Sequence, residues 1–189
     1  PPRSQFTQFF MEKNGLNGSG FKKWVFEPPM LYRSTDMWWG HLGKRYRPHE
    51  GLDLCMFVDG RDRVVRLDGK TMIPAMYDGV VIRIVPDYLG RSIVLEHAFE
   101  KSCKARFCTI YSHIRPDLHL SPGREIRKGN VIAKVEDSFK SKTDISPHLH
   151  ISLGWIPWSI PNERLAWPEI GSPEVMTMLD PLDFIVVDS

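Results

Sequence analysis

Cysteines are scarce in this sequence, and long apolar runs are missing altogether. The 189 residues include only three cysteines, which cannot all pair with one another, so the fold does not depend on a framework of disulfides. No run of 18 apolar residues occurs, and residues 1–5 lack the apolar stretch of a secretory signal. We therefore expect no membrane span in this chain. The compartment in which it works stays open at this level.

The sequence also lacks an excess of charge of either sign. Lysine and arginine total 25 against 23 for aspartate and glutamate, which gives a net charge of +2. A nucleic-acid groove needs a much stronger positive bias, so nucleic acid is not an expected partner. A chain of this length and hydrophobic content can form one core that buries roughly 70% of the surface exposed by the unfolded chain. Such a core needs no metal to hold it, so a bound metal would serve chemistry.

The cysteines leave one alternative open. Cys103 and Cys108 bracket a short polar stretch that suits the tip of a hairpin, so the sequence is compatible both with a disulfide between them and with two free thiols. Cys55 is expected to be a small core residue.

Short runs rich in Val, Ile, Phe and Tyr dominate from residue 63 onward. The predicted strands are Val64–Leu67, Val80–Val85, Ile93–Phe99, Phe107–Ile114, Val131–Val135 and Leu149–Ile156. The spacers 87–90 and 121–123 are too short for crossover helices, which favours antiparallel pairing. We predict a mainly β fold: a single antiparallel β domain, a small open barrel or sandwich with a groove across the sheet and short flanking helices.

Short helices are expected near both ends of the chain. Phenylalanines recur at helical spacing over residues 6–10, and Asn14–Gly15 supplies a stop. The tripeptide Ser172-Pro173-Glu174 has the cap, proline and acidic residue of a first helical turn, which predicts a second short helix through Leu179.

Seven histidines hold the candidate chemistry. In the first pattern His49 and Asp53 are four positions apart, but His113 and Asp117 repeat that spacing, so spacing alone cannot choose between them. Zinc ligands must approach one another within a few Å, whereas positions four apart in a strand lie roughly 13 Å apart. The chain must therefore bend, and Gly51 permits the tight or left-handed turn that would bring both side chains to one point.

The second pattern is His148-Leu149-His150 at the start of a predicted strand. Both imidazoles then project from one face about 7 Å apart. One can bind a metal while the other touches the metal-bound water or the substrate. The alternative is two polar residues on a solvated face of the sheet. His113 closes a neighbouring strand and can present a third imidazole.

Taken in order, these patterns resemble the lysostaphin/LytM-type zinc metalloendopeptidases. Those enzymes carry a His-x-Gly-x-Asp motif, a central His after Tyr-x, and a terminal His-Leu-His preceded by Pro. The matching segments here are His49-Glu50-Gly51-Leu52-Asp53, Tyr111-Ser112-His113 and Pro147-His148-Leu149-His150. The resemblance covers roughly residues 38 to 157, because several strand and turn segments between the motifs also occur in the family's order.

The resemblance implies both a site and a function. It implies that His49, Asp53 and His150 ligate a zinc ion, and that His113 and His148 flank the bound water as catalytic residues. It further implies an endopeptidase that hydrolyses amide bonds in peptidoglycan peptides, located in the periplasm or outside the cell.

The domain organisation that follows has three parts. Residues 1–37 form an N-terminal arm or extension, expected to cover part of the groove. Residues 38–160 form the LytM-like domain, and residues 161–189 form a C-terminal extension with a short helix packed on the same domain.

Two other functions stay open. One is hydrolysis of a peptide outside the wall, such as a Gly-rich segment of a secreted protein. The other is a non-catalytic scaffold that binds the cell wall or an amidase. The scaffold is suggested by residues 136–146, which replace the Gly-rich stretch that the family usually has before its terminal motif, and by six tryptophans that can supply a contact surface.

Overall fold

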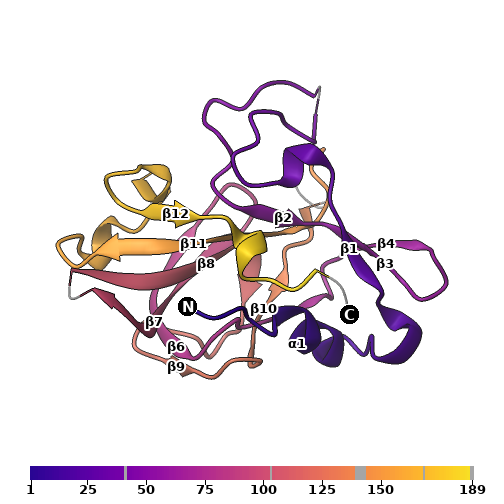
Figure 1. Ribbon diagram of the computed structural model, residues 1–189, viewed down its shortest axis with the longest axis horizontal. Coiled ribbons are helices and arrows are strands. Elements are labelled where there is room, and N and C mark those ends of the chain that lie inside the picture. Colours follow the sequence, from indigo (N-terminus) through magenta and orange to yellow (C-terminus); the bar gives the residue numbers. More distant parts are fainter. Residues whose placement is uncertain (41, 103, 139–143, 168, 188–189) are drawn as a thin grey trace.

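An antiparallel sheet forms the centre of the molecule in the computed structural model (Figure 1), which describes residues 1–40, 42–102, 104–138, 144–167 and 169–187. Its strands follow one another in the spatial order β12-β11-β8-β7-β6-β9. Their bounds are β6 Gly79–Pro86, β7 Arg91–Ser102, β8 Ala105–Pro116, β9 Glu125–Ile126, β11 Leu149–Pro157 and β12 Thr177–Leu179. The mainly β, antiparallel fold class is confirmed, and the sheet is not closed into a barrel.

The long central strands are buried because both faces of the sheet are covered. In β8, Phe107 and Tyr111 contribute to the main core, whereas Cys108 and Ile110 belong to a second apolar cluster on the opposite side. This alternation follows from the two-residue period of a strand. The predicted strand Phe107–Ile114 lies within β8, and the other five predicted strands likewise overlap observed ones.

Shorter strands extend and flank the central sheet. Strand β2 (Leu52–Leu54) pairs with the beginning of β11, while β10 (Val131–Val135) pairs with both β5 (Met72–Pro74) and the end of β8. A separate small sheet contains β1 (Lys23–Val25), β3 (Met56–Val58) and β4 (Val64–Arg66). The pairing of β2 with β11 brings Asp53 of the first motif opposite His150 of the second.

The N-terminal helix α1 (Phe6–Lys13) is confirmed, and it belongs to the main core. Phe6 and Phe10 are almost completely buried. The aromatic rings that pack around Phe10 belong to Trp24 of β1, Phe57 of β3 and Phe21, which precedes β1. Asn14 follows the helix and Gly15 has a φ of 65°, as the expected stop requires.

The helix predicted from Ser172 to Leu179 is wrong. Residues 173–175 form a turn, and Thr177–Leu179 is strand β12, which pairs with Leu153–Trp155 of β11. The local capping signals are outweighed by the hydrogen bonds available at the edge of β11. Nearby chain forms short 3-10 turns instead, at Asn162–Arg164, Glu169–Gly171 and Pro181–Asp183.

The two ends of the chain meet beside α1. Ser4 forms a parallel bridge with Ile185, and its backbone N–H donates to the Phe184 carbonyl at 2.7 Å. Residues close to both termini therefore belong to one packed body.

The described cysteines are free thiols. Cys55 and Cys108 are both buried without a disulfide, as expected for Cys55, and Cys103, the partner proposed for Cys108, lies outside the described residues. In the described part of the chain, no helix has the length and apolar character needed to cross a membrane.

Candidate metal centre

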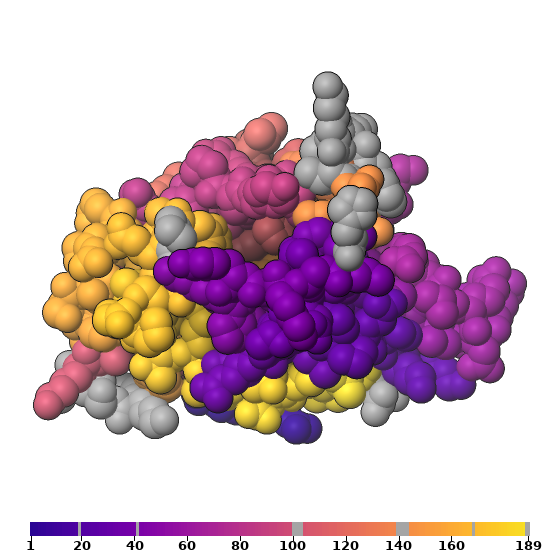
Figure 2. Space-filling view, turned by 90° about the horizontal axis from the view of Figure 1, so that it is seen from above, coloured from indigo at the N-terminus to yellow at the C-terminus, as the bar shows by residue number. Residues whose placement is uncertain are grey.

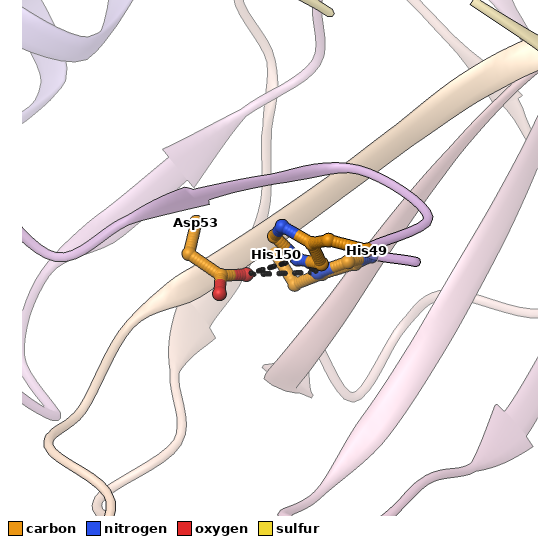
Figure 3. A group of neighbouring side chains, drawn as sticks. All are labelled: His49, Asp53 and His150. Carbon is orange, nitrogen blue, oxygen red and sulfur yellow. Dashed lines mark hydrogen bonds and ion pairs between the residues drawn. The ribbon is translucent and has the colours of Figure 1, made fainter. Parts of the chain in front are cut away.

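Three buried side chains converge on one point at the β2–β11 pairing (Figure 3). Asp53 Oδ1 lies 3.1 Å from His49 Nε2 and 2.8 Å from His150 Nδ1, and the two imidazole nitrogens lie 3.0 Å apart. Ligands at 2.0–2.2 Å from a tetrahedral zinc ion lie roughly 3.3–3.5 Å from one another. A shift of a few tenths of an ångström would therefore fit these three atoms around a zinc ion.

Chain geometry explains how the two motifs meet. Asp53 and His150 are direct cross-strand partners in the β2–β11 ladder. Gly51 is needed for close approach: a Cβ at this position would lie 2.2 Å from the Ile151 carbonyl oxygen and 2.8 Å from His150 Nε2. Of the tight or left-handed turns that Gly51 permits, the left-handed one is not observed: residue 51 is a bend, and Gly51 is not among the glycines with positive φ. The close approach of this segment to β11 depends on the lack of a side chain at Gly51 and not on a positive φ.

Each candidate histidine turns one ring nitrogen toward Asp53 and the other toward an outside partner. The Leu31 carbonyl accepts from His49 Nδ1–H at 3.0 Å, so Nε2 is the nitrogen that faces Asp53 Oδ1. Ser152 Oγ lies 2.9 Å from His150 Nε2, so Nδ1 is the nitrogen that faces Asp53 Oδ1. A hydrogen bond on the far ring nitrogen is the usual support of a metal-binding histidine.

The second oxygen of Asp53 is held by residues that sequence reasoning missed. Trp38 Nε1–H donates to Oδ2 at 2.7 Å, and the Arg45 guanidinium lies 3.5 Å from the same oxygen. Burial disfavours the charged carboxylate, but the His49 ring and the hydrogen bonds from His150 and His49 outweigh it, so the pKa of Asp53 is held well below its usual range. A charged carboxylate therefore faces one ring nitrogen of His49 and one of His150.

The other two predicted histidines lie beside this cluster. His148 donates from Nδ1–H to the Ser146 carbonyl at 2.9 Å, and its Nε2 lies 3.9 Å from Asp53 Oδ1. Burial lowers the pKa of His148 to about 3, against the opposing pull of the Asp53 carboxylate, so the ring is neutral at neutral pH. The His113 ring is 4.8 Å from the His148 ring and 5.8 Å from the His150 ring, centroid to centroid.

His113 is partnered by Asp87 and not by Asp117. Asp87 accepts from both the backbone N–H and the ring Nδ1–H of His113, at 2.9 and 3.1 Å. Burial alone would raise the pKa of Asp87, but the hydrogen bonds and charge of His113 hold it far below its usual range. In the sequence Asp87 shows only as the start of the turn Asp87–Gly90, with nothing that links it to a histidine 26 positions away.

All five predicted residues border one cleft of about 310 Å³. Its other lining residues are mostly aromatic or apolar: Trp39, Tyr88, Leu89, Ile145 and Trp167, with Arg45, Glu50 and Asp87 as the remaining charged groups. Seen from above, a hollow lies between the purple segment around residue 45, the yellow C-terminal segment and the magenta turn after β6 (Figure 2). Much of the unusual stretch 136–146, namely residues 139–143, lies outside the described residues.

The profile of Peptidase family M23 matches residues 59–159, slightly more than half of the chain. The chain belongs to peptidase family M23. The matched span of this M23 protein contains His113, His148 and His150 but begins after His49 and Asp53. Those two residues lie outside the match, and the β2–β11 pairing places Asp53 opposite His150.

Three solved structures are among those to which this chain is similar. Csd3 of Helicobacter pylori is 20% identical, with a TM-score of 0.44 over 89% of this chain and 35% of that one. The catalytic domain of the prophage-encoded M23 protein EnpA from Enterococcus faecalis is 15% identical, with a TM-score of 0.42 over 84% and 94%. Lysostaphin is 18% identical, with a TM-score of 0.42 over 77% and 51%.

Coverage differs among these neighbours. The chain spans about a third of the length of Csd3 and about half of the length of lysostaphin. Among curated proteins the chain has no match. The family assignment rests on the profile match.

Proposed function

We propose that this protein is a zinc-dependent endopeptidase that hydrolyses amide bonds in the peptides of bacterial peptidoglycan. The observation that carries the proposal is the cluster of three buried ligand atoms, 2.8 to 3.1 Å apart, on His49, Asp53 and His150. Membership of a peptidase family supports the reaction class. The substrate class is inferred from the family.

The donor set fits zinc. Two imidazole nitrogens and one carboxylate oxygen are the ligand types of catalytic zinc sites, which use three protein ligands and keep a fourth position open. No thiolate lines the cleft among the described residues, so a soft metal is not favoured. When bound, zinc supplies a Lewis acid that lowers the pKa of a coordinated water and polarises a carbonyl.

His148 and His113 are proposed to handle protons. His148 Nδ1 is occupied by the Ser146 carbonyl, and because the ring is neutral its Nε2 is left as a proton acceptor on the cleft side. His113 places a second imidazole beside it, with the two ring centroids 4.8 Å apart. A pair of imidazoles can take a proton from the attacking water and deliver one to the leaving amine, typically worth 10²- to 10⁴-fold in rate.

The surroundings of the site suit an extended peptide. A second hollow of about 570 Å³ shares His49 and Glu50 with the cleft, and it is lined on its far side by Tyr32, Arg33 and residues 171–174. Substrate can therefore extend to both sides of the reacting bond. We propose that the partner is the peptide part of the wall and that the protein works in the periplasm or outside the cell, as a wall substrate requires.

The direct test is release of peptides from purified sacculi by the zinc-loaded protein, followed by mass spectrometry. His150→Ala is expected to lose bound zinc and all activity. His119→Ala is the matched control, since His119 is exposed and does not line the cleft, and this variant should retain both. A wild-type protein that holds no zinc by elemental analysis, or equal activity in His150→Ala, would overturn the proposal.

Two further assays on the same protein, one of oligoglycine cleavage and one of sacculus binding, separate the alternative functions. Cleavage of oligoglycine with no product from muropeptides would indicate a peptide substrate outside the wall. Binding to sacculi that survives complete zinc removal, with no bond cut under any condition, would indicate a scaffold.

A further inference from the structure

Asp87 accepts more hydrogen bonds than the turn that it begins requires. Its side chain is 2% exposed and accepts five hydrogen bonds. Oδ1 accepts from the backbone N–H of Leu89 and of Gly90 and from the His113 ring, at 3.0, 2.7 and 3.1 Å. Oδ2 accepts from Ser92 Oγ and from the His113 backbone N–H, at 2.8 and 2.9 Å. One carboxylate thus ties the β6–β7 turn to the residue of β8 that lines the cleft.

His113 is held in a conformation that the chain would not adopt unaided. Its φ is 61°, in the left-handed region that non-glycine residues rarely adopt. The β7–β8 ladder is irregular at this point: Arg91 pairs with Ile114 but Ile93 pairs with Tyr111, so two residues of β8 oppose Ser92. Such a bulge redirects a side chain, and bulges are common beside active sites. Because Asp87 binds both the backbone and the ring of His113, it stabilises the bulge and the ring orientation together.

The contact also selects the nitrogen that His113 offers to the cleft. A carboxylate accepts hydrogen bonds and cannot donate them, so Nδ1 of His113 must carry the proton. Nε2 is then the nitrogen available for substrate or water. His148 has the same arrangement, with Nδ1–H bound to a carbonyl, so both imidazoles present Nε2 to one space.

The carboxylate is itself anchored. Ser92 Oγ lies 2.7 Å from Ser112 Oγ and accepts from Trp167 Nε1–H at 3.0 Å. The Trp167 ring is in turn 6.1 Å from the His150 ring. A chain of side-chain contacts therefore runs from the C-terminal segment through Ser92 to Asp87, which leaves the carboxylate little freedom to rotate away from His113.

We propose that Asp87 is a positioning residue of the hydrolase, fixing the tautomer and direction of His113 so that its Nε2 faces the scissile bond. The inference rests on the proposed function. It goes beyond that function by assigning a role to a residue outside every motif of the sequence.

The main experiment is a double-mutant cycle on the zinc-loaded protein. Asp87→Asn is expected to lower kcat by about 10²- to 10⁴-fold with little change in KM, the range for loss of a carboxylate partner or of a general acid–base group. The second background is His113→Asn, because Asn tolerates the left-handed region and lacks the imidazole. There, Asp87→Asn should change kcat by less than about 3-fold, since coupled residues are not additive.

Asp59→Asn is the matched control. Asp59 is also buried and holds a turn, accepting from two backbone N–H groups and from Arg63, but it lies between β3 and β4 and touches no histidine in the described chain. Its substitution should leave kcat unchanged. An equal loss of kcat on Asp87→Asn in both backgrounds would mean that Asp87 only holds the turn and would overturn the inference.

A spectroscopic measurement covers the case in which Asp87→Asn fails to fold or the residual activity is too low. In 15N-labelled wild-type protein with zinc, one-bond and long-range 1H–15N correlations should show a proton on Nδ1 of His113. A bare Nδ1 would overturn the inference. If wild type cleaves no amide at all, the proposed function fails, while the tautomer of His113 still tests its pairing with Asp87.

Discussion

Two side chains contact Oδ2 of Asp53, the carboxylate oxygen that does not face the histidines, and they hold the carboxylate in its orientation. Trp38 Nε1–H supplies the shorter of the two contacts, at 2.7 Å, and Arg45 the longer, at 3.5 Å. Loss of an outer hydrogen bond of this kind typically costs 10- to 100-fold in metal affinity. We expect Trp38→Phe to weaken zinc binding by about that factor, measured by competition with a fluorescent chelator. Trp158→Phe, at a half-exposed ring away from the cleft, should bind zinc like wild type.

Gly51 is the residue where a single methyl group should disable the site. A Cβ there would meet the Ile151 backbone oxygen at 2.2 Å, and backbone cannot move aside as a side-chain tip can. We expect Gly51→Ala to separate β2 from β11, with loss of zinc in elemental analysis and a fall in unfolding free energy of about 1–3 kcal/mol.

The control for this variant is Gly43→Ala. The nearest atom to a Cβ at Gly43 is the terminal methyl of Met37, at 2.8 Å, which can rotate away. Normal zinc content in both variants would contradict the close-approach argument.

The five candidate residues could be named from the sequence, whereas the residues that contact them could not. His49, Asp53, His113, His148 and His150 line one cleft, and they were named because their ordered motifs resemble a family, since spacing alone could not choose among the histidines. Their roles as metal ligands and catalytic groups stay predictions. Asp87, Trp38 and Arg45 carry no local signal, since each meets its partner only through tertiary packing.

At the scale of secondary structure, α1 acts as a part of the core. It was predicted within an N-terminal arm, yet Phe10 is 1% exposed and its ring lies 4.7 Å from that of Trp24. Truncating a buried phenylalanine to alanine costs about 3–5 kcal/mol, so Phe10→Ala should lower the unfolding free energy by that amount in urea titrations. Gln8→Ala, on the exposed face of the same helix, should stay within about 0.5 kcal/mol of wild type.

Length decided which elements could be predicted. The strands β7, β8 and β11 are long enough for their β-branched and aromatic residues to be read directly. Among the strands of two or three residues, β4 was predicted from its paired valines, whereas β2 and β9 are defined by the partner that they pair with. Pairing with a partner strand also explains the error at residues 172–179. The sequence there has helix signals, but residues 177–179 form β12 because they pair with the edge of β11. The predicted domain boundaries at residues 37 and 160 stay predictions.

For the whole molecule, buried histidines make stability depend on pH. His97 is 3% exposed, and both ring nitrogens are bound, to the Asp78 carbonyl and to Thr109 Oγ1. Burial lowers its pKa to about 4, so between pH 6.5 and 4 the unfolded chain binds more protons than the folded one. The contribution of His97 is therefore complete above pH 6.5 and is lost as the pH falls toward 4.

The size of this effect can be measured by urea unfolding of zinc-loaded protein. We expect the His97 contribution to fall by about 2 kcal/mol between pH 7.5 and pH 5. His97→Gln keeps hydrogen-bonding groups but does not titrate, so it should lose less stability than wild type over the same interval by that amount. Parallel curves for the two proteins would assign the pH dependence to other groups.

The bridge between Ser4 and Ile185 places the two ends of the polypeptide next to each other. A circular permutant is therefore geometrically accessible, with a short linker joining the old ends and new ends opened at the exposed tip near Asp62, between β3 and β4. In that rearranged gene the ligands would be encoded in the order His150, His49, Asp53 while their neighbours in space stay the same. The proposed site would therefore depend on the pairing of β2 with β11 and not on the order of the motifs along the chain.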